Sequence, residues 1–369
     1  MQIDRPPHGA GLPEPAEGAR AESRPRGLLL APAPSNPRTS GRRILGLASA
    51  AAIAVAGCLA GGSPAPTPSA APSTVVSPSA SSSASRTDPA VMSGATTIAV
   101  IGDFGTGDAN EGAVASMVAG WSPAAIVTTG DDYYSMAGGS SGAEKGDRSI
   151  GRYYCAWLGN AQAGTSCNGN PGATNRFFPS TGNHDYSDWG PDGGLGGYVA
   201  YFSLPGNERY YTSSHGALDL FILDTGLIEG STVEADAQRT WLQSALATST
   251  AKWKAVVFHH PPYSSGTTHG SSTWMRWPFR EWGADVVING HEHDYERVMV
   301  DGFPYIVNGL GGGSRYSFGT PIAGSAARYS ASWGAMRVTA TSTSLQLAFL
   351  SIDNGGTVRD ELTLTKAGG

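Results

Sequence analysis

Four apolar runs of strand length each lead directly into aspartate or histidine, and this pattern constrains the fold more than any other feature. TTIAVIGDFG reaches Asp103 and AAIVTTGDD reaches Asp131. KAVVFHH reaches His259, and ADVVINGH leads into His291 and His293. Ligands of α/β sheets bind beyond the carboxyl ends of the strands. The sequence therefore predicts that distant stretches deliver carboxylates and imidazoles to one rim.

The order of the predicted elements favours an α/β fold. Strands are predicted within residues 96–105, 124–132, 217–225, 254–260 and 284–291, with helices over 111–121, 232–249 and 271–283. Four further strands follow without intervening helices, over residues 303–309, 333–341, 344–352 and 358–365. Alternation followed by a β meander predicts a two-sheet α/β sandwich with flanking helices.

The N-terminal region is predicted to lie outside this domain. Residues 1–41 are polar and rich in Pro, Gly and Arg, which is typical of a disordered extension. Residues 42–58 combine two arginines with a short apolar run, as a signal peptide does. Residues 59–94 form a Ser/Pro/Ala-rich linker, so the folded domain is expected over 95–369.

The end of the signal segment, Val-Ala-Gly-Cys58, resembles a bacterial lipobox. The resemblance implies cleavage before Cys58 and a lipid on its sulfur, which would bring membrane contact. The protein is then exported, either lipid-anchored at the bacterial cell surface or secreted. A plain secretory signal with an incidental cysteine is the alternative.

Charge and cysteine spacing narrow the possibilities further. The net charge is −6, so nucleic acid is not expected as a binding partner. Cys155 and Cys167 lie close together in a Gly/Asn-rich stretch. In an exported chain these two cysteines are free to form a disulfide, and two unpaired thiols are the alternative.

Carboxylates together with imidazoles suit Zn, Fe and Mn ions. A carboxylate can also bridge two cations about 4 Å apart, a spacing used in phosphoester hydrolysis. Paired cations lower the pKa of a bound water and offset charge on the phosphoryl oxygens. The residue types alone therefore indicate metal-dependent hydrolysis.

Five blocks, GDFG, GDDYY, GNHD, VVFH and GHEH, occur in this order over roughly residues 97–300. They resemble the calcineurin-like metallophosphoesterases and, more narrowly, the purple acid phosphatases, whose pattern is GDxG, GDxxY, GNH[DE], VxxH, GHxH. The resemblance implies a metallophosphoesterase fold and a dinuclear-metal phosphomonoesterase, acid phosphatase-like, acting on small-molecule phosphate esters. It also implies direct attack of a metal-bound hydroxide on phosphorus.

The resemblance assigns the metal ligands residue by residue. The first metal would take Asp103, Asp131, Tyr134 and His293, and the second would share Asp131 and add Asn183, His259 and His291. A tyrosine phenolate implies Fe(III) at the Tyr134 site, with Fe, Zn or Mn at the second. His259 is preferred to His260 because it completes the Val-x-x-His block.

Two further histidines are expected to act on the substrate. The resemblance implies that His184 contacts phosphate, and that His269 contacts phosphate or protonates the leaving alkoxide, unless it is a solvated loop residue. Asp132 is expected to be a turn residue. Asp185 is expected either to orient His184 or to cap the next segment.

Other functions stay open on the sequence alone. The same site could serve a metal-dependent phosphodiesterase or nucleotidase. A non-catalytic surface lipoprotein that binds metal or ligand is a different class of protein, and a cell-wall interaction module is a third. All seven ligand positions are filled, which argues against a decayed enzyme. The oligomeric state has no sequence signal.

Overall fold

The computed structural model describes residues 94–159, 167, 171–189 and 194–367. The predicted N-terminal extension, the signal peptide with Cys58 and almost all of the linker lie outside the described residues.

Among the helices of the described ranges, none combines the length and apolar character that a membrane span requires.

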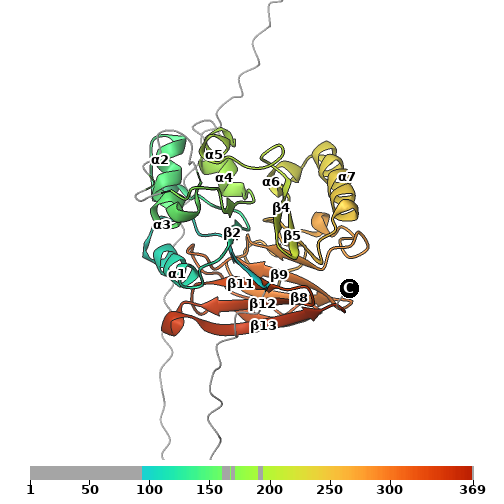
Figure 1. Ribbon diagram of the computed structural model, residues 1–369. Helices are drawn as coiled ribbons and strands as arrows, with labels where there is room; N and C mark the ends of the chain where they lie inside the picture. The colour runs from blue at the N-terminus through green and yellow to red at the C-terminus, as the bar shows by residue number, and fades with distance from the viewer. Residues whose placement is uncertain (1–93, 160–166, 168–170, 190–193, 368–369) are drawn as a thin grey trace, which may run out of the picture. The chain divides into compact units, whose positions relative to one another are not determined.

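Two mixed β-sheets build the described domain (Figure 1). The first has the order β13-β12-β11-β1-β2-β3, and the second has the order β10-β8-β9-β7-β6-β5-β4. The bounds in the first sheet are β1 Thr96–Ile101, β2 Ala125–Thr128, β3 Phe177–Phe178, β11 Gly334–Ala340, β12 Ser344–Ser351 and β13 Thr357–Thr365. Those in the second are β4 Tyr211–His215, β5 Leu218–Ile222, β6 Trp253–Val257, β7 Val286–Asn289, β8 Tyr295–Val300, β9 Phe303–Asn308 and β10 Ser325–Tyr329.

The alternating side chains of β5 show how the layers pack. Leu220 and Ile222 join the core between the sheets, whereas Phe221 packs on the other face with Leu242 of helix α7 (Thr232–Thr248). Successive side chains of a strand point to opposite faces, so this division requires a covered sheet on both sides. Burying each such side chain stabilises the fold by roughly 1.5–3 kcal/mol. The predicted two-sheet sandwich with flanking helices is confirmed.

Helices cover the domain on two sides, with α1 to α3 on one side and α7 on the other (Figure 1). The α-helices are α1 Ala109–Gly120, α2 Gly142–Gly146, α3 Arg152–Tyr154, α4 Asn183–Asp188, α5 Gly196–Tyr201, α6 Thr225–Ile228 and α7 Thr232–Thr248. Short 3-10 turns lie at η1 Ser135–Ala137, η3 Cys155–Trp157, η4 Thr273–Met275 and η5 Asp353–Gly355, with a π-helical turn at η2 Asp147–Gly151. Helix α7 begins where the Ser231 side chain accepts the Glu234 N–H, a standard N-cap.

The helix predicted over residues 271–283 is wrong. Only the three residues of η4 are helical there, and the chain continues as successive turns. Pro278 has no N–H to donate and disfavours a helical preceding residue, so it stops the helix that the apolar pattern suggested. Trp277 and Phe279 are both buried instead on the outer face of the second sheet.

Parallel strand pairing places the predicted ligand residues. Ile101 of β1 lies opposite Thr128 of β2, and the Asp103 N–H then donates to the Gly130 carbonyl at 3.0 Å. In the other sheet, Val257 of β6 lies opposite Ile288 of β7, and the Gly290 N–H donates to the His259 carbonyl at 3.0 Å. In each sheet, two neighbouring loops that carry predicted ligands are therefore hydrogen-bonded to each other just beyond the strands.

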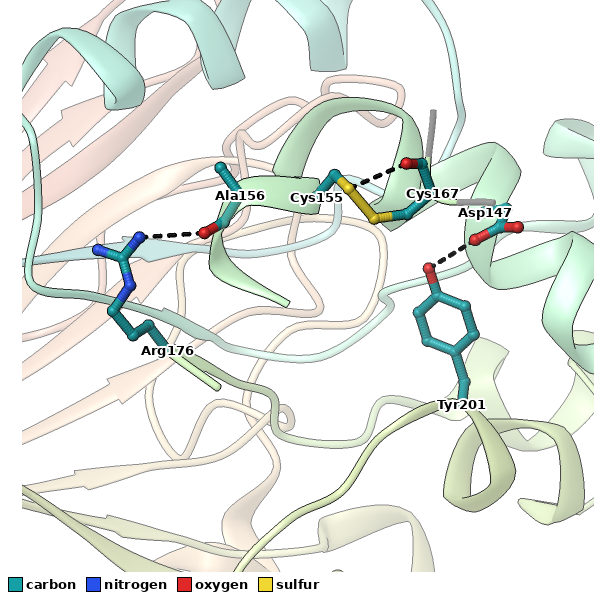
Figure 2. Close-up of a disulfide and its surroundings, with 6 residues drawn as sticks. All are labelled: Asp147, Cys155, Ala156, Cys167, Arg176 and Tyr201. Atoms are coloured by element: carbon teal, nitrogen blue, oxygen red, sulfur yellow. Dashed lines mark hydrogen bonds between the residues drawn. A yellow bond between two sulfur atoms is a disulfide. The ribbon is translucent and has the colours of Figure 1, made fainter. Parts of the chain in front are cut away.

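A disulfide joins Cys155 to Cys167, with Cα atoms 5.5 Å apart (Figure 2). The predicted pairing is confirmed. Close to it, the Tyr201 hydroxyl donates to Asp147 Oδ1 at 3.1 Å, which connects α5 to the π-helical turn. The disulfide therefore joins two points of the chain between the second and third sequence blocks.

Removing the disulfide is expected to lower the free energy of unfolding by about 2–4 kcal/mol, because the bridge restricts the unfolded chain. The double variant Cys155→Ala/Cys167→Ala should show this loss in urea unfolding. Reductant should destabilise the natural protein to a similar extent and leave the double variant unchanged. Equal effects of reductant on both proteins would contradict a stabilising bridge.

Candidate metal centre

The predicted ligand residues lie in loops that follow parallel strands of both sheets. Asp103 follows β1, Asp131 follows β2, Asn183 begins α4 after β3, His259 follows β6, and His291 and His293 follow β7. The strand ends place these side chains on one rim, as the strand-end pattern predicted.

Three of these side chains lie close together with the predicted ligand Tyr134. Asp103, Asp131 and His293 each offer a ligand atom within 4.8 Å of the others, and all three are buried. The Tyr134 hydroxyl donates to Asp131 Oδ2 at 3.1 Å and lies 3.0 Å from His293 Nε2. His293 Nε2 is in turn 3.4 Å from Asp103 Oδ1. The predicted first ligand set is therefore brought together.

A second group meets on the other side of Asp131. His259 Nε2 lies 3.0 Å from Asn183 Oδ1 and 3.0 Å from His291 Nδ1. The same nitrogen is 3.5 Å from Asp131 Oδ1. Asp131 therefore faces both groups, with Oδ2 toward Tyr134 and Oδ1 toward His259.

Hydrogen bonds to backbone carbonyls orient two of the imidazoles. His259 Nδ1 donates to the Thr129 carbonyl at 2.8 Å, and His293 Nδ1 donates to the Ser314 carbonyl. A carbonyl can only accept, so Nδ1 carries the proton and Nε2 presents its lone pair to the cluster. This is the arrangement that fixes a metal-binding histidine.

The electrostatics of the cluster suit a bound cation. Burial, and then the neighbouring Asp131, raises the pKa of Asp103 well above its ordinary value, and burial also raises the pKa of Asp131. Burial lowers the pKa of His259 to about 3 and that of His293 to about 4. Neutral imidazole is the form that binds metal, and a cation would favour the ionised carboxylates. The donor set and its surroundings therefore fit metal ions.

Three predicted ligands have left-handed backbone conformations, with φ of 55° at Asp103, 54° at Asp131 and 71° at His291. Such conformations cost of order 1–3 kcal/mol each and concentrate at functional sites. The backbone at His291 is not extended, and its N–H turns back to donate to both Asp103 carboxylate oxygens at 3.0 Å. His291 and His293 still reach the same cluster.

Two glycines allow the carboxylates to approach this closely. A Cβ atom at Gly182 would lie 2.1 Å from Asp131 Oδ1, and one at Gly290 would lie 2.4 Å from Asp103 Oδ2. The glycine of the Gly-Asn and Gly-His pairs in the sequence blocks is thus required because any larger residue would collide with a carboxylate.

The two predicted substrate-facing histidines border the cluster on different sides. The His184 ring packs against the Tyr134 ring at a tilt, with centroids 4.6 Å apart, and its Nδ1 donates to Asp188 Oδ2 at 3.1 Å. Its side chain is 40% exposed, so the ring reaches solvent. His269 is exposed and stacks 3.9 Å from His291.

The remaining sequence expectations are resolved by contacts. Asp185 does not orient His184, because its carboxylate accepts the Asp132 N–H at 3.0 Å and the Gly182 N–H at 2.8 Å, which caps α4. The expectation of a turn at Asp132 is wrong, because residues 131–134 follow an irregular path and the Asp132 side chain is fully buried. His260 is buried beside the cluster, with Nδ1 2.9 Å from the Thr225 hydroxyl.

A glycine-rich segment with no expected function forms one wall of the cluster. The Gly313 N–H donates to the Asp103 carbonyl at 2.8 Å, and the Tyr316 ring stacks on His293 at 4.1 Å with an interplanar angle of 8°. The Ser314 carbonyl of the same segment orients His293. The run of three glycines after a buried strand was the only signal for this close approach.

Two curated proteins are similar to this chain in sequence. "Purple acid phosphatase 15" of Arabidopsis thaliana is 30% identical over 130 residues, covering 31% of this chain and 24% of that protein. "Purple acid phosphatase 17" of the same plant is 25% identical over 263 residues, covering 61% of this chain and 70% of that protein. The chain thus spans about a quarter of the first relative and more than two thirds of the second.

Two solved structures share the fold at lower identity. GAP50, the anchor in the inner membrane complex of Plasmodium, has a TM-score of 0.57 at 18% identity, over 73% of this chain and 89% of that one. The purple acid phosphatase PPD1 from yellow lupin has a TM-score of 0.55 at 17% identity, over 73% and 54%. The calcineurin-like phosphoesterase family model matches residues 96–295, more than half of the sequence, so this chain belongs to that family.

Proposed function

We propose that this chain is a dinuclear-metal phosphomonoesterase of the purple acid phosphatase type. The observation that carries the proposal is the position of Asp131, whose two oxygens face two separate donor groups, Tyr134 at 3.1 Å and His259 at 3.5 Å. A buried carboxylate in this position is suited to bridge two cations. The names of the two Arabidopsis relatives support the same class of enzyme.

The proposed ligand sets follow from the two groups of side chains. The first cation would be held by Asp103, Asp131, Tyr134 and His293, and the second by Asp131, Asn183, His259 and His291. Mixed oxygen and nitrogen donors suit Fe, Zn or Mn at the second position.

The Tyr134 phenol points to Fe(III) at the first position. Burial, and then the carboxylates of Asp131 and Asp103, raises the pKa of Tyr134 well above its ordinary value. A phenolate would therefore form only beside a strongly charged cation. Fe(III) meets that requirement, and it would give the protein a phenolate-to-iron colour.

The chain supplies groups for the substrate as well as for the cations. When bound, the two cations would lower the pKa of a water and offset charge on the phosphoryl oxygens. Asp188 accepts the Nδ1 proton of His184, and a ring that carries a proton on its other nitrogen as well would donate that N–H to a phosphoryl oxygen. His269, on the His291 side, would donate a proton to the leaving alkoxide.

The proposed location is outside the cytoplasm. A lipid on Cys58 would hold the domain at the bacterial cell surface through the linker of residues 59–94, and a secreted form is the alternative. The Cys155–Cys167 disulfide supports export, because disulfides persist in oxidising compartments.

The Asp131→Ala variant is expected to lose phosphatase activity by about 10³-fold or more, because one carboxylate serves both cation positions. Its metal content should drop below two ions per chain in elemental analysis. Asp236→Ala is the matched control, since this carboxylate lies on α7 with a side chain 71% exposed. Full hydrolysis by an Asp131→Ala protein without metal would sink the scheme.

Tyr134→Phe is expected to remove the visible absorption band of the purified protein, because it removes the phenolate ligand. Tyr133→Phe is the matched control, since the adjacent Tyr133 is buried and its hydroxyl donates to the Gly138 carbonyl at 3.2 Å. Absorption spectra with iron analysis provide the measurement. A band that survives in Tyr134→Phe, or a colourless and iron-free active enzyme, would contradict the assignment.

The natural protein is expected to hydrolyse nitrophenyl phosphate with a kcat/KM at least about tenfold above that for bis-nitrophenyl phosphate, a difference of roughly 1.4 kcal/mol in transition-state stabilisation. A monoester presents more unsubstituted oxygens to the cations and His184 than a diester does. Chelation should abolish both activities. A preference for the diester would favour a phosphodiesterase or nucleotidase, and metal binding without hydrolysis would favour a non-catalytic surface protein.

A further inference from the structure

The Glu292 side chain leaves the metal centre, although the residue stands between His291 and His293. Glu292 is fully buried, and its Oε1 accepts the backbone N–H groups of His269 and Gly270. The segment that carries two metal-facing histidines is therefore tied to the His269 loop, defined here as residues 264–270.

The His269 loop packs directly on this carboxylate. A Cβ atom at Gly266 would lie 2.2 Å from the carboxyl carbon of Glu292. Only glycine fits such a contact, so the loop and the carboxylate are shaped for each other. The two backbone hydrogen bonds to Glu292 are what hold the loop in this position.

The position of the His269 ring follows from these contacts. An exposed loop side chain normally samples several rotamers, and ordering it costs entropy. His269 is exposed, yet its ring stacks on His291 at 3.9 Å with an interplanar angle of 28°. The hydrogen bond from the His269 N–H to Glu292 sets the backbone position of His269. The stacking on His291 then sets the orientation of the His269 ring.

Stability alone gives a poor account of Glu292. Its Oε2 is buried and has no hydrogen-bond partner among the described residues. A buried polar atom without a partner destabilises a fold, and such atoms often have a functional explanation.

We propose that Glu292 is a positioning residue that holds His269 over the substrate side of the metal centre. The proposal rests on the proposed function of His269 as proton donor to the leaving alkoxide. The side chain acts through two hydrogen bonds that it accepts from the loop backbone. It places the imidazole and makes no contact with substrate itself.

Glu296 offers a matched control. It is also fully buried, and its Oε2 accepts the Ser265 N–H at 2.6 Å, at the other end of the same loop. The two glutamates therefore anchor one loop from one segment, but only Glu292 binds the backbone at His269. A general loss of loop packing should appear in variants of both residues.

The kinetic test compares substrates with poor and good leaving groups. Glu292→Ala should lower kcat for an alkyl phosphate by about 10–100-fold and lower kcat for nitrophenyl phosphate much less, as His269→Ala should. The double variant should be no slower than His269→Ala, because both changes remove one function. Glu292→Gln keeps an acceptor oxygen and should retain most of the natural kcat for both substrates. In Glu296→Ala, any loss of kcat should be the same for the alkyl phosphate and for nitrophenyl phosphate.

A second measurement does not depend on metal or activity. In hydrogen–deuterium exchange of the metal-free protein, the His269 and Gly270 amides should exchange about tenfold or more faster in Glu292→Ala than in Glu296→Ala. Unchanged protection in Glu292→Ala, or in Glu292→Leu if the alanine variant does not fold, would overturn the positioning role, because neither side chain offers an acceptor oxygen.

The outcomes separate this inference from the proposed function. If the kcat losses of Glu292→Ala and His269→Ala multiply in the double variant, the two residues act independently and the inference is overturned. The proposed phosphatase function would still stand. Loss of bound metal in Glu292→Ala would assign the residue to the metal centre instead. If the natural protein has no phosphatase activity but Glu292→Ala still speeds exchange of the His269 and Gly270 amides, the contact is supported. The function on which the inference rests would then be refuted.

Discussion

The buried carboxylate of Asp131 is the constraint on which the rest of the site depends. Its Oδ1 accepts the backbone N–H of His184 at 3.0 Å, and its Oδ2 accepts the Tyr134 hydroxyl proton. Gly182 leaves no space for a Cβ atom beside it. Taking a carboxylate out of water is costly unless opposite charge compensates. With a left-handed backbone as well, Asp131 lowers the stability of the metal-free fold, and a cation would recover that loss.

The two sheets make this arrangement rigid without using the ligand side chains. The Asp103 N–H bonds to the Gly130 carbonyl, and the Gly290 N–H bonds to the His259 carbonyl, so each ladder continues into its ligand loops. A shift of one loop would break the hydrogen bonds of its neighbour. Sites built on strand ends hold their geometry better than sites on free loops, which suits chemistry that tolerates little displacement.

Local chemistry explains how far the sequence could predict this protein. A Gly-Asp pair directly after an apolar run marks both the end of a strand and a candidate ligand, so Asp103 and Asp131 could be identified together. Pro278 was present in the predicted helix, but the apolar pattern around it reflected burial against a sheet. The contacts of Tyr316 and Glu292 join loops far apart in sequence, and such contacts depend on sheet register rather than on local pattern.

The segment after β7 shows why a ligand motif can carry more than its ligands. His293 reaches Tyr134 on the metal side, while Glu292 and Glu296 bind the backbone of the His269 loop on the other. Any movement of this segment would shift His291, His293 and the His269 loop together. A single rigid segment therefore keeps the distance between the two groups constant, which two independently anchored loops could not do. The unconstrained position in the Gly-His-x-His pattern becomes, in this chain, the residue that joins both halves of the site.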